Sequence, residues 1–453
     1  MSTIETPIAR VPTALDLPEV LVMVGEFILL WDVSYLGQAA FRHQNLLPCL
    51  SVSRHFRRSL LPVFWRTVDG YAMRNVPEGV LREYAEFARV LRNPLRREDI
   101  RRMAPLYTTA INIQTTHDLE GHARRLIRRN PRLQELDLSL WRPEAEDVTL
   151  FSHLGQLSTL RLATNGQGVI ATDPEFLSRA LASISRTLVS LQMQAKVFLH
   201  ACRGHLFLPE LKVLRLDGTA SGQVFDSLPE MCPVLETLDV TTDTNESGER
   251  LEALFRSGHC PKLVNWTTPG QGNNEQLARL IRSHRQGFQE LDIRIEEGSD
   301  DVKNAVKQHG NTLRKLQICS EADPEITLAF LIDILQSCRQ LQSFEFENIH
   351  GGGVSSFDVN ALLNPMNWSS PATLENLAFT GPALKLNDLS LESDEWQSMD
   401  ESFHNWRLIN PSWQMESSQQ QKREFLKGLF GRAGGFQHLR TITLNGVIYW
   451  REF

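Results

Sequence analysis

The sequence predicts a repetitive α/β solenoid, with parallel strands on a concave face and helices outside, preceded by a small all-α bundle. Three observations predict this fold class. The motif L-x-x-L-x-L recurs from Leu133 onward at nearly constant spacing, and the segments between its copies carry apolar residues at helical period. Residues 16–66 follow a different pattern, with short apolar clusters and a helix-start sequence.

The N-terminal segment, residues 16–66, predicts three short helices. Asp16-Leu17-Pro18-Glu19 is a helix start, because Asp caps the helix, Pro fits the first turn and an acid follows three residues later. This first helix is expected to end near Leu30. Apolar clusters at residues 46–56 and 60–65 supply two further helices. The three helices would pack into a small bundle, after residues 1–15, which we expect to be disordered.

This segment resembles an F-box. An F-box begins with Leu-Pro, continues through an apolar helix and closes on Val-Ser-Arg-x-Trp/Phe, with a Trp further on. The matching residues are Leu17-Pro18, Val24 to Ile28, Val52-Ser53-Arg54-His55-Phe56 and Trp65. The sequence departs from the pattern in its long link, residues 31–44, and in Phe56, where Trp is commoner.

The resemblance implies a docking surface for the Skp-type adaptor of a cullin-RING ubiquitin ligase. An F-box protein performs no catalysis itself but holds a substrate lysine near a ubiquitin-carrying enzyme, which raises their effective concentration. The alternative is that the helices only cap the first repeat, as every solenoid requires. The exposed apolar anchors implied by the resemblance are Leu17, Pro18, Leu21, Ile28, Leu50, Val52 and Phe56.

Residues 67–104 are predicted to be an Arg-rich helical linker. The chain has two dense runs of arginine, either a phosphate-binding patch, since Arg forks onto phosphate oxygens, or a solvated helix face, which we favour. The runs are Arg89, Arg92, Arg96, Arg97, Arg101 and Arg102, and then Arg124, Arg125, Arg128, Arg129 and Arg132.

Residues 105–453 are predicted to form the solenoid. Nine motif starts between Leu133 and Leu341 are separated by 26 residues on average, and two further copies begin at Leu374 and Leu439. Each copy is preceded by a helical pattern that ends at a polar or Pro break, so each unit is helix, turn, strand. One unit cannot bury its apolar face, but stacked neighbours bury a continuous core. The alternative is an ordinary α/β domain with chance leucines.

This region resembles the leucine-rich-repeat solenoids, particularly the irregular type that follows an F-box. Its motif is degenerate and lacks a dependable Asn or Cys after the strand. The long interval between the last two copies predicts an inserted loop near residues 382–420, either a plain surface loop or a recognition insert. Cys232, Cys260 and Cys338, which precede strands, are interpreted as small buried turn residues.

Side chains alternate along a strand, so the residues beside the inward leucines face the concave surface. They are mixed in sign and mildly acidic, which suits a folded protein or peptide with basic groups and not a polyphosphate. The predicted substrate-facing residues are Glu135, Asp137, Arg161, Arg215, Asp217, Asp239, Glu290, Asp292, Arg294, Lys315, Glu345 and Glu347.

Composition excludes several functional classes. A net charge of -7 offers no global attraction to nucleic acid or to an anionic membrane. The six cysteines form no C-x-x-C pair, the histidines form no metal-binding motif, and no catalytic constellation is recognisable. We therefore expect no enzyme, no cofactor and no metal. With no signal peptide or membrane span, the expected compartment is the cytosol or nucleus.

The sequence favours a substrate-recognition adaptor of an SCF-type ubiquitin ligase, with the adaptor at the N-terminal bundle and an unknown protein substrate on the repeats. The alternative is a scaffold without ligase recruitment. A third class, a small-GTPase activator built on such repeats, would need an exposed catalytic Arg that the sequence does not single out.

Overall fold

A computed structural model describes the chain over a series of ranges. The chain divides into two compact units, residues 1–187 and residues 188–453. The ranges are 17–30, 43–69, 76–92, 108–114, 120–139, 145–163, 174–202, 206–242, 245–268, 273–295, 299–320, 324–348, 357–358, 373–380, 384–385, 438–444 and 447–450.

The first unit begins with the three expected helices: α1 (Pro18–Leu30), α2 (His43–Val52) and α3 (Arg54–Arg66). Gly25 of α1 lies against α3, because a Cβ atom built there would lie 2.7 Å from Leu60 Cδ2 and 3.4 Å from Val63 Cγ1. Leu21, one turn earlier, and Leu46 of α2 are also buried. Gly25 therefore lets α1 lie close to α3, since a larger residue would require the Leu60 side chain to shift or the two helices to separate.

Trp65 joins this bundle to the segment that follows it. Its ring is buried, stacks on Tyr84 with 5.0 Å between centroids, and meets Phe64 edge-on at 5.4 Å. Tyr84 lies between α4 (Glu78–Glu83) and the short 3-10 helix η2 (Ala85–Phe87). Aromatic pairs of this geometry stabilise beyond their buried area.

Parallel strands begin earlier than the sequence indicates. β1 (Thr67–Asp69) pairs with β2 (Val90–Arg92), and β2 pairs with β3 (Ala110–Gln114). The prediction that the solenoid starts at residue 105 is therefore wrong, and residues 67–104, predicted to be a helical linker, contain β1 and β2 as well as the helices α4 and η2. β1 and β2 are only three residues long and each places one apolar residue, Val68 or Leu91, in the core. Strands this short cannot carry an L-x-x-L-x-L motif.

The rest of the first unit follows the predicted helix–strand alternation. Strands β3, β4 (Glu135–Ser139) and β5 (Thr159–Ala163) pair in parallel, in sequence order. Helix α6 (Glu120–Arg128) lies between β3 and β4, α7 (Ala145–Ser152) lies between β4 and β5, and α8 (Pro174–Ile184) follows β5.

The second unit continues the same pattern in a sheet whose strands also follow one another in sequence order. All pairs are parallel except the last, β16 with β17. The strands are β6 (Ser190–Gln194), β7 (Val213–Ala220), β8 (Thr237–Thr242), β9 (Asn265–Thr268), β10 (Glu290–Ile295), β11 (Lys315–Ser320), β12 (Ser343–Asn348), β14 (Asn376–Thr380), β16 (Thr441–Leu444) and β17 (Val447–Trp450). A separate pair joins β13 (Phe357–Asp358) to β15 (Leu384–Lys385).

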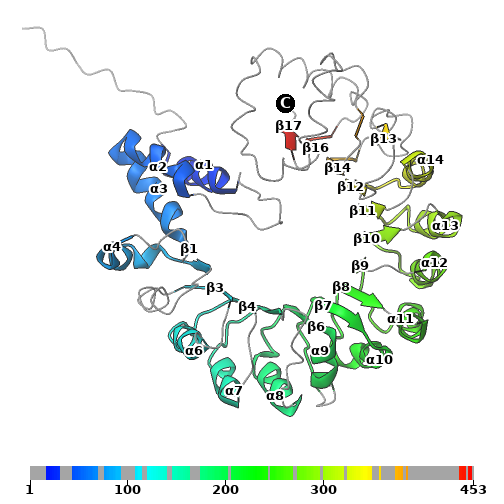
Figure 1. Cartoon of the computed structure of the whole chain (residues 1–453), viewed down its shortest axis with the longest axis horizontal. Coiled ribbons are helices and arrows are strands. Elements are labelled where there is room, and N and C mark those ends of the chain that lie inside the picture. The colour runs from blue at the N-terminus through cyan, green and yellow to red at the C-terminus, as the bar shows by residue number, and fades with distance from the viewer. Residues whose placement is uncertain are drawn as a thin grey trace, which may run out of the picture. The chain divides into compact units, whose positions relative to one another are not determined.

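Helices cover one side of this sheet. Figure 1 shows, within the second unit, the strands on the inner side of the arc and the helices on the outer side. The helices are α9 (Ala195–Cys202), α10 (Gly222–Met231), α11 (Asn245–Ser257), α12 (Asn274–Ser283), α13 (Asp300–Gln308) and α14 (Pro324–Leu335). The predicted α/β solenoid with parallel strands is confirmed.

Alternating burial along the strands matches the motif. Trp266, Leu291, Leu316 and Phe344 stand opposite one another on β9 to β12, and all are at most 2% exposed. The residues on either side of them in each strand are exposed or half-buried. The second and third apolar residues of L-x-x-L-x-L therefore point into the core, as predicted.

An aromatic and histidine cluster fills the middle of the second unit. Phe288 stacks on His284 at 4.2 Å and on Trp266 at 5.8 Å, and Phe255 meets all three rings edge-on. His284 Nε2 donates to the Leu263 carbonyl at 2.8 Å, in the preceding repeat. Burial lowers the pKa of His284 to about 4, so the imidazole is neutral and links two repeats through that hydrogen bond.

The cysteines before strands are buried, as predicted. Cys232 and Cys338 are fully enclosed and Cys260 is 5% exposed. Burial raises the pKa of Cys260 to about 11 and that of Cys338 to about 12, so both thiols stay protonated. Thiols of this kind are inert packing groups.

Some predictions fall outside the described residues. They include the disorder of residues 1–15, the arginines Arg96, Arg97, Arg101 and Arg102 of the first arginine run and, apart from Leu384–Lys385, the loop near 382–420. Within the described ranges, no helix combines the length and the hydrophobicity that crossing a bilayer requires.

Candidate functional site

Exposed apolar side chains gather on the N-terminal bundle. Among the described residues, six large hydrophobic side chains are exposed, and five of them lie directly before α1, in its first half, or on α2. We call these five the bundle apolar surface: Leu17 (48% exposed), Met23 (63%), Val24 (40%), Leu47 (51%) and Val52 (64%). The sixth, Phe207, lies in the second unit.

The residues predicted as adaptor anchors differ in how far their side chains are exposed to solvent. Leu17, Pro18 and Val52 are exposed as expected, and Leu50 and Phe56 are half-buried. The expectation that Leu21 is exposed is wrong, because this side chain is 1% exposed and lies in the bundle core. The side chain of Ile28 lies outside the described residues.

Sequence reasoning missed Met23, Val24 and Leu47 as exposed residues. The first helix, PEVLVMVGEFILL, is apolar almost throughout, so its period does not distinguish a buried face from an exposed one. Gly25, four residues after Leu21, is the feature that would have identified the buried face, because a helix approaches its neighbour most closely at a glycine.

Hydrogen bonds at the junction of α2 and α3 hold Val52 outward. Ser53 caps α3, its Oγ accepting from the Phe56 backbone N–H at 3.1 Å. Arg57 Nε donates to the Leu50 carbonyl at 3.2 Å, which ties α3 to the last turn of α2. The turn is fixed by these bonds, so Val52 is exposed in an ordered backbone.

The second candidate surface is the strand face of the second unit. Its central row runs from Asp239 on β8 through Thr267, Asp292 and Gln317 to Glu345 on β12, each residue opposite the next. Neighbouring strands lie about 4.8 Å apart. The backbone of Asp292 is therefore about 10 Å from that of Asp239 and from that of Glu345, each two strands away. We call Asp239, Asp292, Glu345 and Glu347 the strand-face carboxylates.

All the predicted substrate-facing residues lie on the strand side that the motif indicates, and none is fully buried. The register of the prediction is confirmed, while contact with a substrate stays a prediction. Exposed are Glu135, Arg161, Arg215, Asp217, Glu290 and Lys315; half-buried are Asp137, Asp239, Asp292, Arg294, Glu345 and Glu347.

The strand-face carboxylates raise one another's pKa. Burial, and then the charges of Asp239 and Glu345, raise the pKa of Asp292 to about 6, against an opposing effect of Lys315. Burial also raises the pKa of Asp239 and of Glu345. Among the described residues, these three carboxylates have no ion-pair partner.

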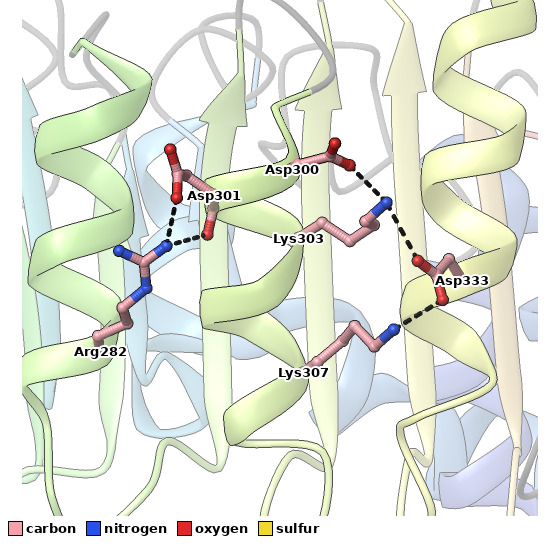
Figure 2. A network of polar contacts seen from close by, with 6 residues as sticks. All are labelled: Arg282, Asp300, Asp301, Lys303, Lys307 and Asp333. Carbon is pink, nitrogen blue, oxygen red and sulfur yellow. Dashed lines mark hydrogen bonds and ion pairs between the residues drawn. The ribbon is translucent and has the colours of Figure 1, made fainter.

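The helical side of the same unit has the opposite character (Figure 2). Arg282 of α12 pairs with Asp301 of α13 at 2.7 Å, and Asp333 of α14 is held by Lys307 at 2.7 Å and Lys303 at 3.1 Å. The hydrogen bond from Lys307 lowers the pKa of Asp333. Charges on this side are paired between successive helices, which fits a structural role.

The first unit shows the same pairing on its strands. Asn112 Nδ2 donates to Asp137 at 2.9 Å, and Arg161 lies 3.7 Å from the same carboxylate. Of the second arginine run, Arg124 of α6 is buried, Arg125 and Arg128 are exposed on α6, and Arg129 and Arg132 are exposed in the turn after it. In the part of the chain that the structure describes, no group of three metal-ligating side chains occurs.

Replacing Asp292 by asparagine should make the second unit more stable at about pH 7.5, by about 1 kcal/mol after solvent screening. The folded pKa of about 6 lies above the ordinary 3.8, so the fold favours the protonated carboxyl and loses stability as the pH rises from about 4 to about 6. The difference should vanish at about pH 4. Urea unfolding at both pH values measures it, with Glu290→Gln as a control on the same strand; an equal difference at both would contradict the argument.

No protein-family model and no curated protein match the chain. It is similar to a chain in the crystal structure of the Rad7 and Elc1 complex in yeast, with a TM-score of 0.44 and 13% identity over 84% of this chain and 94% of that one. It is also similar to a chain of the TLR13–ssRNA13 complex, with a TM-score of 0.32 and 13% identity over 70% of this chain and 55% of that one. Neither similarity adds a partner or an activity to the fold.

Proposed function

We propose that this chain is the substrate-recognition subunit of an SCF-type cullin-RING ubiquitin ligase. The F-box-like bundle docks a Skp-type adaptor through its apolar surface, and the strand face binds a protein substrate. The observation that carries the proposal is the concentration of exposed apolar side chains on α1 and α2. Such a subunit works in the cytosol or nucleus and performs no chemistry of its own.

A helical cap that only covers the first repeat would not need the exposed side chains of the bundle apolar surface. Single exposed hydrophobic residues are ordinary, but a group rimmed by polar residues is typical of a protein-binding site. The bundle already has an internal core at Leu21, Leu46 and Leu60, and Trp65 connects it to the next segment. Leu47 and Val52 take no part in either, so a partner that covers them would gain about 1.5–3 kcal/mol for each side chain fully buried.

The strand face supports the second half of the proposal. Its carboxylates are half-buried and raised in pKa, so a basic side chain of a partner would pair with them at little further cost of desolvation. A protein segment with Lys or Arg is the ligand class that this surface suits.

Binding of the purified chain to a Skp-type adaptor tests the proposal. Leu47→Asp and Val52→Asp each place a charge in the apolar surface, and we expect each to weaken binding by about 100-fold. Phe207→Asp is the matched control, since it changes an exposed apolar residue of the second unit and should bind as the parent chain does.

Circular dichroism should be the same for all three variants, because the changed side chains are exposed. Absence of binding by the folded parent chain would refute the ligase assignment and leave a scaffold whose N-terminal helices serve as a cap. Equal binding by all three variants would refute the docking surface.

A further inference from the structure

A basic cluster borders the bundle apolar surface. Residues 43–68, which span α2 and α3, contain Arg54, Arg57, Arg58 and Arg66 and no Asp or Glu. The first three, with His55, are exposed on the first turns of α3. This segment is locally basic in a chain whose net charge is -7.

The cluster lies at the edge of the apolar surface. Arg54 begins α3 two residues after Val52, the most exposed of the apolar residues. Arg57 Nε donates to the Leu50 carbonyl, so its guanidinium lies against the last turn of α2. The exposed side chain of Val52 and these cationic groups therefore lie together at the junction of α2 and α3, whose backbone is held by hydrogen bonds.

In the part of the chain that the structure describes, the cations Arg54, Arg57 and Arg58 have no ion-pair partner. Their position also opposes the helix dipole, because the N-terminus of a helix carries a partial positive charge that favours acids. The first turn of α3 has no acidic residue. For the stability of the free chain, this arrangement is mildly unfavourable.

We propose that the protein that docks on the bundle apolar surface presents a carboxylate-rich rim, which pairs with Arg54, Arg57 and Arg58. The inference rests on the proposed function and adds the chemistry of its partner. Exposed apolar side chains are of little use to a nucleic acid, whose contacts are dominated by phosphate, whereas apolar centres with polar or charged rims are typical of protein interfaces.

Charge pairing at a rim acts mainly on the association rate and on its salt dependence. The apolar centre acts on the dissociation rate, because it must be uncovered for the partner to leave. The two contributions can therefore be separated in one kinetic experiment on the full-length chain.

The test measures association and dissociation rates of a purified Skp-type adaptor at about 50 mM and about 500 mM NaCl. Arg54→Glu/Arg58→Glu leaves the Arg57 hydrogen bond in place and should lower the association rate about 10-fold or more at low salt. The parent chain should lose affinity at high salt, and the variant should lose much less. Arg54→Gln/Arg58→Gln should lie between them.

Arg279→Glu/Arg285→Glu makes the same charge change at exposed positions of the second unit and should leave the association rate within about 2-fold of the parent value. Rates that respond to neither salt nor Arg54→Glu/Arg58→Glu, while Val52→Asp abolishes binding, would overturn the acidic rim and leave the proposed function standing. Failure of the parent chain to bind refutes the proposed function instead. Binding of a short single-stranded RNA that depends on these arginines but not on Val52 would replace the proposal with a nucleic-acid surface.

Discussion

Replacing Phe288 by alanine should lower the free energy of unfolding of the second unit by about 3–5 kcal/mol. The side chain is fully buried and contacts the rings of Trp266, His284 and Phe255. His309 also packs on it at 5.2 Å, so the ring joins side chains of successive repeats. Its loss leaves a cavity that rigid aromatic neighbours do not fill.

Urea unfolding followed by tryptophan fluorescence measures this loss. Phe207→Ala is the matched control, because it removes the same atoms from a side chain that is 54% exposed. We expect the control to change the free energy of unfolding by less than about 0.5 kcal/mol. Similar losses in both variants would show that the cluster around Phe288 is not a packed core.

Replacing Gly310 by alanine should destabilise the second unit by about 2 kcal/mol or more. A Cβ atom at this position would lie 2.3 Å from the backbone oxygen of Ser337 and 3.2 Å from that of Lys307. Backbone atoms cannot move aside as a flexible side chain does, and the Gly310 carbonyl accepts a hydrogen bond from the Arg339 N–H at 2.9 Å. The substitution must therefore separate two repeats or distort their turns.

Gly121→Ala is the control for this prediction, and its effect has the opposite sign. Gly121 lies in α6, and no atom is within 4 Å of a Cβ built there. Alanine in an open helical position should stabilise by about 0.5–1 kcal/mol. Thermal unfolding of both variants tests the pair, and an unchanged melting temperature for Gly310→Ala would mean that the repeats are less tightly stacked than the structure indicates.

The two candidate surfaces differ in chemistry, and each favours a different partner. The bundle surface has an apolar centre with arginines beside it, while the strand face carries half-buried carboxylates. One partner with a single kind of charge would not suit both. This difference agrees with a subunit that holds an adaptor by one surface and a substrate by the other.

Periodicity was sufficient to predict the repeats. From Leu133 to Leu341 the motif places two apolar residues, separated by one residue, on the same side of each strand, and that alternation determines which residues are buried. The outward row, including Asp292 and Glu345, follows from the same count. It could be predicted because a shift of one residue would expose every leucine.

Three features required the tertiary structure. β1 and β2 were missed because a three-residue strand with one inward side chain has no period. Leu21 was assigned to the wrong side of α1 because a helix that is apolar all round is oriented only by its neighbours, here through Gly25 against Leu60. The linking role of His284 was not predicted, because its hydrogen bond joins residues of different repeats and leaves no local sequence pattern.

The sequence by itself thus determined the repeating α/β fold, the register of its strands and the location of the helical bundle, since each depends on local spacing. Only the tertiary structure decided where the sheet begins, which side of α1 is exposed, and which charges are paired. Those depend on contacts between segments far apart in the chain. Asp333 is neutralised by lysines of the preceding helix, whereas Asp292, with a similar local sequence environment of apolar neighbours, stays without a counter-charge among the described residues.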